Sequence, residues 1–115
     1  MQVKLTTTGR TTGEPREVTL YAWPDGDEDL VLVASQGGKP NDPAWAFNLR
    51  DEPTCTIRRG KTTSTFRAHE VKDRGATRDR LWDLVTAAFP MYRSYQKKTD
   101  RLIPLVVLTP VDQPG

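Results

Sequence analysis

The chain has 115 residues, 28% charged side chains and a formal net charge of +2, which fits one domain over residues 1–115 with a modest core. The weak net charge argues against a nucleic-acid partner, because dedicated binders carry a denser stripe of lysine and arginine. The longest apolar run, IPLVVL, is far shorter than the roughly 20 residues of a transmembrane segment, and the start lacks the basic-then-apolar pattern of a signal peptide. A single cysteine excludes a disulfide framework and is typical of the reducing cytoplasm, where we expect this protein.

Short strands separated by turns dominate the predicted elements. In chain order we predict strands at 3–8, 17–23 and 30–35, a helix at 43–53, a hairpin at 54–71, a helix at 76–90, a short helical turn within 91–100 and a strand within 101–110. Prolines bound the first helix, and apolar residues at helical spacing support the second. About six short strands with two to three short helices, and no regular βαβ alternation, predict a mainly β or α+β fold, either an antiparallel barrel or a sandwich.

The turn between the first two strands, within LTTTGRTTGEPR (5–16), contains more arginines, glycines and hydroxyl groups than a plain turn requires. Its glycines leave backbone N–H groups open, and its two arginines carry planar guanidinium groups that match phosphate oxygens. It is neither a Walker loop nor a dinucleotide fingerprint, because the spacing of both motifs is missing. The residues alone leave two interpretations open: an anion-binding nest, or a long hairpin loop with solvated arginines.

Paired glycines follow the predicted strand 30–35, within SQGGKPNDPAW (35–45). Glycines at the end of a buried strand let the backbone approach a flat ligand closely. Ser35 would offer a hydroxyl group there and Trp45 an aromatic wall. The alternative is a compact loop with Trp45 in the core.

The segment FPMYRSYQKKTDR (89–101) places two tyrosines three residues apart, so on a helical turn both hydroxyl groups point roughly the same way. Such a pair is more often half-buried packing than a catalytic acid. The basic residues that follow, Lys97, Lys98 and Arg101, are expected to form a solvated face.

The chain lacks the residues for independent catalysis. His69 lies in a predicted strand without a nucleophile or metal partner, and we expect it at the surface, whereas Cys55 is expected to point inward. No Ser-His-Asp set and no carboxylate pair can be assembled, and one histidine and one cysteine without ligand spacing argue against a metal site. An enzyme with this sequence would need an external cofactor.

Taken together, LTTTGRTTGEPR, LVLVASQGGKPNDPAWAFNL and YRSYQKKTDRLIPLVVLTP resemble, in this order, the deazaflavin-dependent nitroreductase family, which uses coenzyme F420. The resemblance covers residues 4–110. It implies a split β-barrel and hydride transfer from reduced F420 to an electron-poor small molecule of the enone, quinone or nitroaromatic type.

The resemblance also implies roles for individual residues. Arg10 and Arg16 match phosphate-contacting arginines, and Tyr92 is the candidate that positions or protonates the acceptor, although solvent could supply the proton. Cofactor contacts are implied for Arg10, Thr11, Thr12, Gly13, Arg16, Ser35, Gln36, Gly37, Gly38, Lys39, Trp45 and Asn48. Substrate contacts are implied for Tyr21, Trp45, Tyr92 and Tyr95. Gln36 replaces a frequent lysine and Phe89 a tyrosine, which bears on affinity and substrate more than on cofactor class.

Two alternatives stay open beside an F420-dependent reductase. The first is an FMN-dependent oxidoreductase on the same kind of barrel, because FMN also joins a tricyclic ring to a phosphate. The second is a non-catalytic carrier of F420 or of a lipophilic molecule. In each case the partner is a small molecule, and the chain could pair with a second copy as a homodimer through an exposed sheet face.

Overall fold

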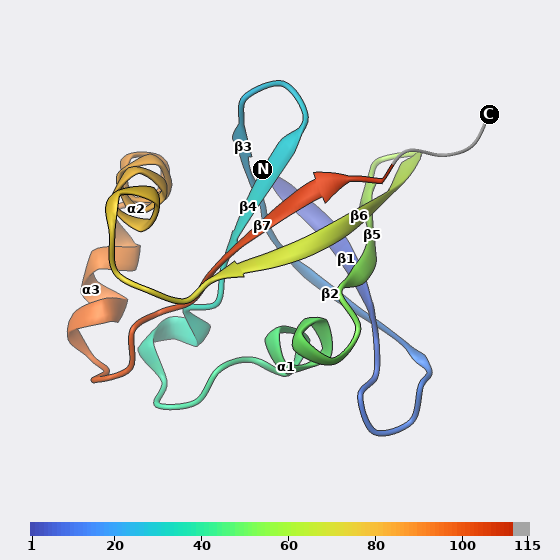
Figure 1. The fold of residues 1–115 in the computed structure, drawn as a ribbon, viewed down its shortest axis with the longest axis horizontal. Coiled ribbons are helices and arrows are strands. Elements are labelled where there is room, and N and C mark those ends of the chain that lie inside the picture. The colour runs from blue at the N-terminus through green and yellow to red at the C-terminus, as the bar shows by residue number, and fades with distance from the viewer. Residues whose placement is uncertain (112–115) are drawn as a thin grey trace.

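A single curled antiparallel sheet with three α-helices forms the fold (Figure 1), in a computed structural model that describes residues 1–111. The strands are β1 (Gln2–Thr8), β2 (Pro15–Tyr21), β3 (Trp23–Asp25), β4 (Asp29–Val33), β5 (Thr54–Arg59), β6 (Thr62–Val71) and β7 (Leu105–Pro110). The helices are η1, a 3₁₀ turn (Gln36–Gly38), α1 (Ala44–Asp51), α2 (Ala76–Ala88) and α3 (Met91–Lys97). The predicted split-barrel type of fold is therefore confirmed, with seven strands in the described residues rather than about six.

The additional strand arises because the predicted strand 17–23 is divided at Ala22. The strand order is β2-β1-β5-β6-β7-β4-β3, so β2 forms one edge of the sheet and β3 the other. Ala22 is fully buried between them, and its N–H donates to the carbonyl of Met1 at 2.9 Å. Two edges joined by one residue must lie close together, and this forces the sheet to curl.

Apolar side chains pack on both faces of the sheet. The inner cluster fills the curl with residues such as Leu5, Leu32 and Ile57, and the outer cluster joins β4 and β7 to α2 and α3 through Val31, Leu81 and related side chains. Full burial of such side chains contributes roughly 1.5–3 kcal/mol each. The helices thus cover only part of the outer face.

The two isolated side chains of the sequence lie where they were predicted. Cys55 is 3% exposed in the inner cluster, and burial raises the pKa of its thiol to about 12. His69 is exposed on β6. Within residues 1–111, no helix is long and apolar enough to cross a lipid bilayer.

Candidate active site

The three segments that carry the resemblance lie along one end of the sheet. In Figure 1, α3, η1, α1 and the β1–β2 loop follow one another along the lower side of the molecule. Asp42 links two of these segments, because its carboxylate accepts from Arg101 at 2.8 Å and from Arg50 of α1 at 2.7 Å. Segments far apart in the sequence therefore form one continuous surface.

The β1–β2 loop is held in shape by its own backbone. The N–H of Gly9 donates to the carbonyl of Glu14, and the N–H of Gly13 donates to the carbonyl of Gly9, both at 2.7 Å. Gly13 has a φ of 74°, which favours glycine. A Cβ atom on Gly9 would lie 3.0 Å from Thr12 Oγ1 and 3.1 Å from the Glu14 carbonyl. The first glycine thus permits close packing and the second permits the turn.

Asn48 of α1 fixes this loop to the rest of the molecule. Its Nδ2 donates to Thr7 Oγ1 at 3.0 Å, and its Oδ1 accepts from the backbone N–H of Arg10 at 3.1 Å. The side chain is 7% exposed, so both polar ends are satisfied inside the protein. Asn48, predicted as a cofactor contact, acts in the structure as a positioning residue for the loop.

The two arginines of the loop keep their charges available. The Arg10 guanidinium carbon lies 4.5 Å from the centre of the Phe47 ring, and Arg16 Nη2 donates to Thr12 Oγ1 at 3.4 Å. Neither arginine forms an ion pair with a carboxylate within residues 1–111. In the same part of the chain, the N–H groups of Thr11 and Thr12 have no hydrogen-bond acceptor.

A cavity of about 330 Å³ lies beside these donors. It is lined by Thr7, Gly9, Arg10, Thr11, Thr12, Arg16, Glu17, Val18, Ala44, Trp45 and Asn48. Open backbone amides with two uncommitted guanidinium groups are the donors that bind a phosphate or carboxylate. The residues present therefore fit the anionic part of the implied cofactor.

The segment after β4 contains three consecutive residues with positive φ: Gln36 at 45°, Gly37 at 64° and Gly38 at 83°. Gly38 packs directly on α3, where a Cβ atom would lie 2.7 Å from the carbonyl oxygen of Tyr95. Ser35 is 8% exposed, whereas Lys39 is exposed. The predicted contacts 35–39 thus form a tight turn whose shape depends on α3.

Arg101 holds this turn in place, which corrects the expectation that it belongs to a solvated face. Its guanidinium donates to the carbonyls of Ala34 at 3.0 Å, Ser35 at 2.8 Å and Lys39 at 2.9 Å, and to Asp42 Oδ1 at 2.8 Å. The side chain is 16% exposed. The sequence KKTDR resembles a solvated basic run, and nothing local to it indicates partners about 60 positions earlier in the chain.

An aromatic cluster forms the other end of the candidate site. Trp23 Nε1 donates to Tyr92 Oη at 2.9 Å, and the ring of Tyr21 stacks on Trp23 with centroids 5.7 Å apart. Phe89 and Tyr95 both pack edge-on against Tyr92. Tyr92 is 6% exposed, and burial raises the pKa of its hydroxyl, partly offset by the Trp23 hydrogen bond. The contact of the Trp23 indole N–H with Tyr92 is the one at this end of the site that the sequence did not indicate.

The predicted substrate residues divide between two places. Tyr21, Tyr92 and Tyr95 belong to this aromatic cluster, whereas Trp45 lies at the loop cavity and packs against the inner cluster of the sheet. Trp45 was predicted to contact both the cofactor and the substrate. Its position at the loop cavity favours the cofactor contact.

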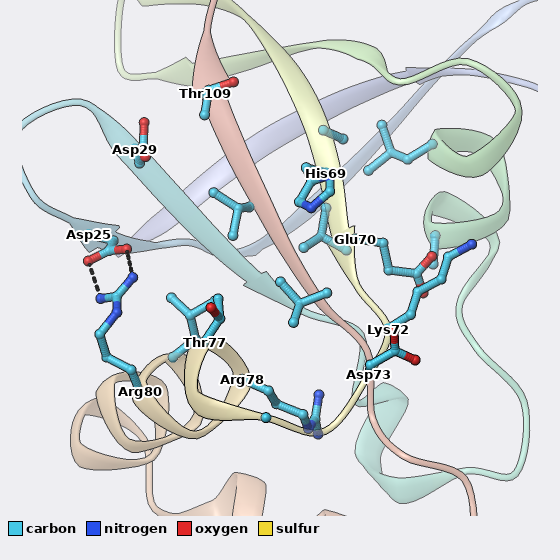
Figure 2. Close-up of a pocket in the computed structure, with 18 of the residues that line it drawn as sticks. Asp25, Asp29, His69, Glu70, Lys72, Asp73, Thr77, Arg78, Arg80 and Thr109 are labelled. Atoms are coloured by element: carbon cyan, nitrogen blue, oxygen red, sulfur yellow. Dashed lines mark hydrogen bonds and ion pairs between the residues drawn. The ribbon is translucent and has the colours of Figure 1, made fainter.

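A larger cavity, of about 1010 Å³, lies elsewhere, over β4, β6, β7 and the start of α2 (Figure 2). None of the sequence-predicted site residues lines it. Its size alone therefore does not make it the active site.

Comparison with known proteins agrees with this geometry. The model of the F420H(2)-dependent quinone reductase family matches residues 1–110. The chain is 40% identical over 106 residues to an F420H(2)-dependent quinone reductase of Mycobacterium tuberculosis strain H37Rv, which covers 91% of this chain and 70% of that protein.

Solved structures also include a similar F420-H2 dependent reductase. A structure described as an F420-H2 dependent reductase (FDR-A) superposes with a TM-score of 0.81 at 37% identity, covering 93% of this chain and 92% of that one. A structure described as a domain-swapped dimer superposes with a TM-score of 0.82 at 37% identity, covering 93% of this chain and 78% of that one.

Proposed function

The chain belongs to the F420H(2)-dependent quinone reductase family, and from that premise we propose how its own residues contribute to the reaction. The protein is an F420H2-dependent oxidoreductase, and quinones are the acceptors of its family. Reduced F420, when bound, supplies a hydride, and the acceptor takes up this hydride together with a proton. Enone and nitroaromatic acceptors are part of the proposal, and FMN chemistry is not favoured.

The observation that carries the proposal is the set of unpaired donors beside the β1–β2 loop. Arg10, Arg16 and the amides of Thr11 and Thr12 face a cavity and have no acidic partner among the described residues. We assign this site to the phosphate of F420. Gly13 contributes through the shape of the turn, since its N–H is already bonded to Gly9.

The turn 35–39 is proposed to lie along the deazaflavin ring. In Figure 1 this turn lies between the β1–β2 loop and α3, the helix that carries Tyr92 and Tyr95. A site that joins a ring to a phosphate requires such an order. The Ser35 hydroxyl and the backbone of Gly37 offer polar groups there. Gly38 contributes through the shape of the turn, since its N–H donates to the carbonyl of Ser35 at 2.9 Å, and Arg101 keeps the turn rigid. Rigid placement matters because hydride transfer depends on the distance and angle between the reacting atoms.

Tyr92 is proposed to position the acceptor by a hydrogen bond. Its oxygen accepts from Trp23, which leaves the hydroxyl proton free to donate to a carbonyl oxygen of the substrate. The raised pKa keeps this group a neutral phenol through the neutral range. A positioning role is therefore favoured over proton transfer, and solvent is left as the proton source. Tyr21 and Tyr95 would border the same acceptor.

A homodimer is part of the proposal. The support is the structure described as a domain-swapped dimer, which matches most of this chain at 37% identity. Light scattering coupled to size exclusion would test it: a mass of one chain at every concentration would contradict the dimer.

The proposed function is tested by titrating the protein with F420 and, in parallel, with FMN at the same salt concentration. We expect F420 to bind tightly and FMN weakly, followed by oxidation of reduced F420 when a soluble quinone is added. A preference for FMN would contradict the cofactor assignment. Binding of F420 without turnover of any acceptor would support the carrier alternative.

A further inference from the structure

The large cavity over the sheet contains a buried positive charge that the proposed reaction does not use. Arg78, on the first turn of α2, is 5% exposed and lines this cavity. In Figure 2, Arg78 and Arg80 leave the helix in opposite directions, Arg80 toward Asp25 and Arg78 toward the connection that holds Lys72 and Asp73.

Two arginines of this cavity, Arg50 and Arg80, have carboxylate acceptors, whereas Arg78 has none among residues 1–111. Arg80 makes two hydrogen bonds to Asp25, both at 2.9 Å, and Arg50 makes two to Glu70, at 2.7 and 2.9 Å. Within residues 1–111, Arg78 Nη1 is a buried side-chain nitrogen without any hydrogen-bond partner. Leaving a charged donor buried and unsatisfied is costly, and native structures seldom do so without a ligand or a bound solvent molecule.

The surroundings of Arg78 increase this cost. Burial lowers the pKa of its guanidinium, and the neighbouring charge of Arg74 lowers it further, against a smaller opposite effect of Asp79. One favourable contact of the guanidinium is the Trp82 ring, whose centre lies 5.4 Å away. The position on the helix is also unfavourable for a cation, because the N-terminal end of a helix carries partial positive charge.

The start of α2 adds unsatisfied donors beside this cation. The helix is 13 residues long, and its N-cap residue, Gly75, has no side chain to accept a hydrogen bond. The first intrahelical bond runs from the N–H of Asp79 to the carbonyl of Gly75 at 2.9 Å. The N–H groups of residues 76–78 therefore have no partner within the described chain. All three residues line the same cavity.

We propose that the start of α2 and Arg78 bind the oxyanion of a small compound, a carboxylate or a phosphate. Open amides at a helix N-terminus and a guanidinium group are complementary to such a group in charge and in donors. Lys72 and Arg74 add positive charge at the rim. Four carboxylates also line the cavity, of which those of Asp25 and Glu70 are neutralised by Arg80 and Arg50. This mixed lining favours a small anion over an extended polyanion.

The site is separate from the cofactor loop, because the two cavities share no lining residue. The proposal therefore does not depend on how F420 binds. A test must still resolve the two places, since phosphate could also reach Arg10 and Arg16.

Amide NMR spectra of the full chain distinguish binding at the start of α2 from binding at the β1–β2 loop. Inorganic phosphate and glutarate are titrated separately, and the probes are the amide signals of Gly75 to Asp79. We expect saturable shifts there with at least one of the anions, and the stronger response identifies phosphate or carboxylate as the ligand group. Shifts confined to the β1–β2 loop, or no saturable shift, would overturn the proposal.

Matched variants separate the site from general charge effects. Arg78→Gln should weaken the binding about tenfold or more, as expected for a lost charged hydrogen bond. The double variant Arg80→Gln with Asp25→Asn, which removes an ion pair from the same cavity without a change in net charge, should leave it unchanged. Equal effects of the two variants would overturn the assignment to Arg78. Shifts that follow protein concentration without added anion would assign the donors to a second copy of the chain instead.

Thermal unfolding provides an independent readout. In anion-poor buffer, Arg78→Met should melt no lower than the wild type, because removing an uncompensated buried charge is not destabilising. The bound anion should raise the melting temperature of the wild type and not that of Arg78→Met. A variant that melts far lower in anion-poor buffer would show that Nη1 is already satisfied inside the protein, which also contradicts the proposal.

Discussion

The two ends of the candidate site are built in different ways. At the β1–β2 loop, the arginines are exposed, and the donors that face the cavity are not used by the protein itself. At the aromatic end and in the neighbouring turn, Tyr92, Ser35 and Gly38 are buried, and polar groups of Tyr92 and Ser35 are bonded to Trp23 and Arg101. Free donors provide affinity, whereas packed groups provide geometry. Substitutions at the two ends should therefore affect different quantities.

The largest effect is expected for Arg101→Ala. It removes the donor to three main-chain carbonyls and to Asp42, so the free energy of unfolding should fall by about 3 kcal/mol. Chemical denaturation measures this change. Lys97→Ala, at an exposed position of the same segment, is the control. If both variants were equally stable, the turn would not depend on Arg101.

Gly38→Ala is expected to lower the free energy of unfolding almost as much as Arg101→Ala. The new Cβ would lie 2.7 Å from the Tyr95 carbonyl, in a residue whose φ is 83°, and strain and overpacking together should cost about 2–3 kcal/mol. Gly37→Ala is a matched control, since its φ is 64° but no atom lies within 4 Å of the added Cβ; it should cost only about 1 kcal/mol. Similar denaturation midpoints for the two variants would argue against close contact with α3.

At the loop end, Arg10→Ala and Arg16→Ala should each weaken F420 binding by about 1.5–3 kcal/mol, because each loses a charged hydrogen bond. The free energy of unfolding should change little, since neither guanidinium is paired with a carboxylate of residues 1–111. Fluorescence titration measures the affinity, and Arg59→Ala, at the exposed end of β5, is the control. Unchanged affinity in both loop variants would remove the phosphate from this site.

The smallest effect is expected for Tyr92→Phe, which should lower kcat by about two- to tenfold, the equivalent of one hydrogen bond. The affinity for F420 should stay the same, because Tyr92 is proposed to contact the acceptor and not the cofactor. Steady-state kinetics with a quinone separates these quantities. An unchanged kcat on every accepted substrate would exclude Tyr92 from positioning the acceptor.

The same variant tests the pKa of Tyr92 through stability. The folded-state pKa is raised, so the unfolded chain releases this proton first as the pH rises. The contribution of the neutral phenol is complete below the unfolded pKa of about 10 and is lost as the pH rises toward the folded value. Above pH ~10 the wild type should therefore lose stability that Tyr92→Phe does not lose. Parallel losses in both proteins would contradict the shift.

Local patterns were sufficient to predict most of the elements. The prolines around α1 and the apolar spacing of α2 predicted both helices, and the hairpin predicted at 54–71 corresponds to β5 and β6. The division of the strand at Ala22 was not predictable in this way. Both halves have strand-like sequences, and the separation depends on which neighbours they pair with, β1 on one side and β4 on the other.

The candidate site was predicted in its parts but not in its connections. Glycines and arginines in the β1–β2 loop indicate an anion site because their chemistry is local. The hydrogen bond from Trp23 to Tyr92 joins residues 69 positions apart, and Arg101 reaches Ser35 across 66 positions. No short-range signal marks such contacts. The placement of Trp45 away from the tyrosines likewise depends on how α1 docks against the sheet.

The order of strands in the sheet also has a consequence for how the chain acquires its structure. Strand β4 pairs only with β3 and with β7, the last strand of the described chain. During synthesis, β1, β2, β5 and β6 can associate early, while the β3–β4 hairpin has no sheet to join until residues 105–110 have emerged from the ribosome. Pairing of strands that are far apart in the sequence is slow, because the chain loses the entropy of loop closure before the stabilising contacts between the strands form. Completion of the sheet is thus a late event, and it coincides with assembly of the aromatic end, where Trp23 meets Tyr92.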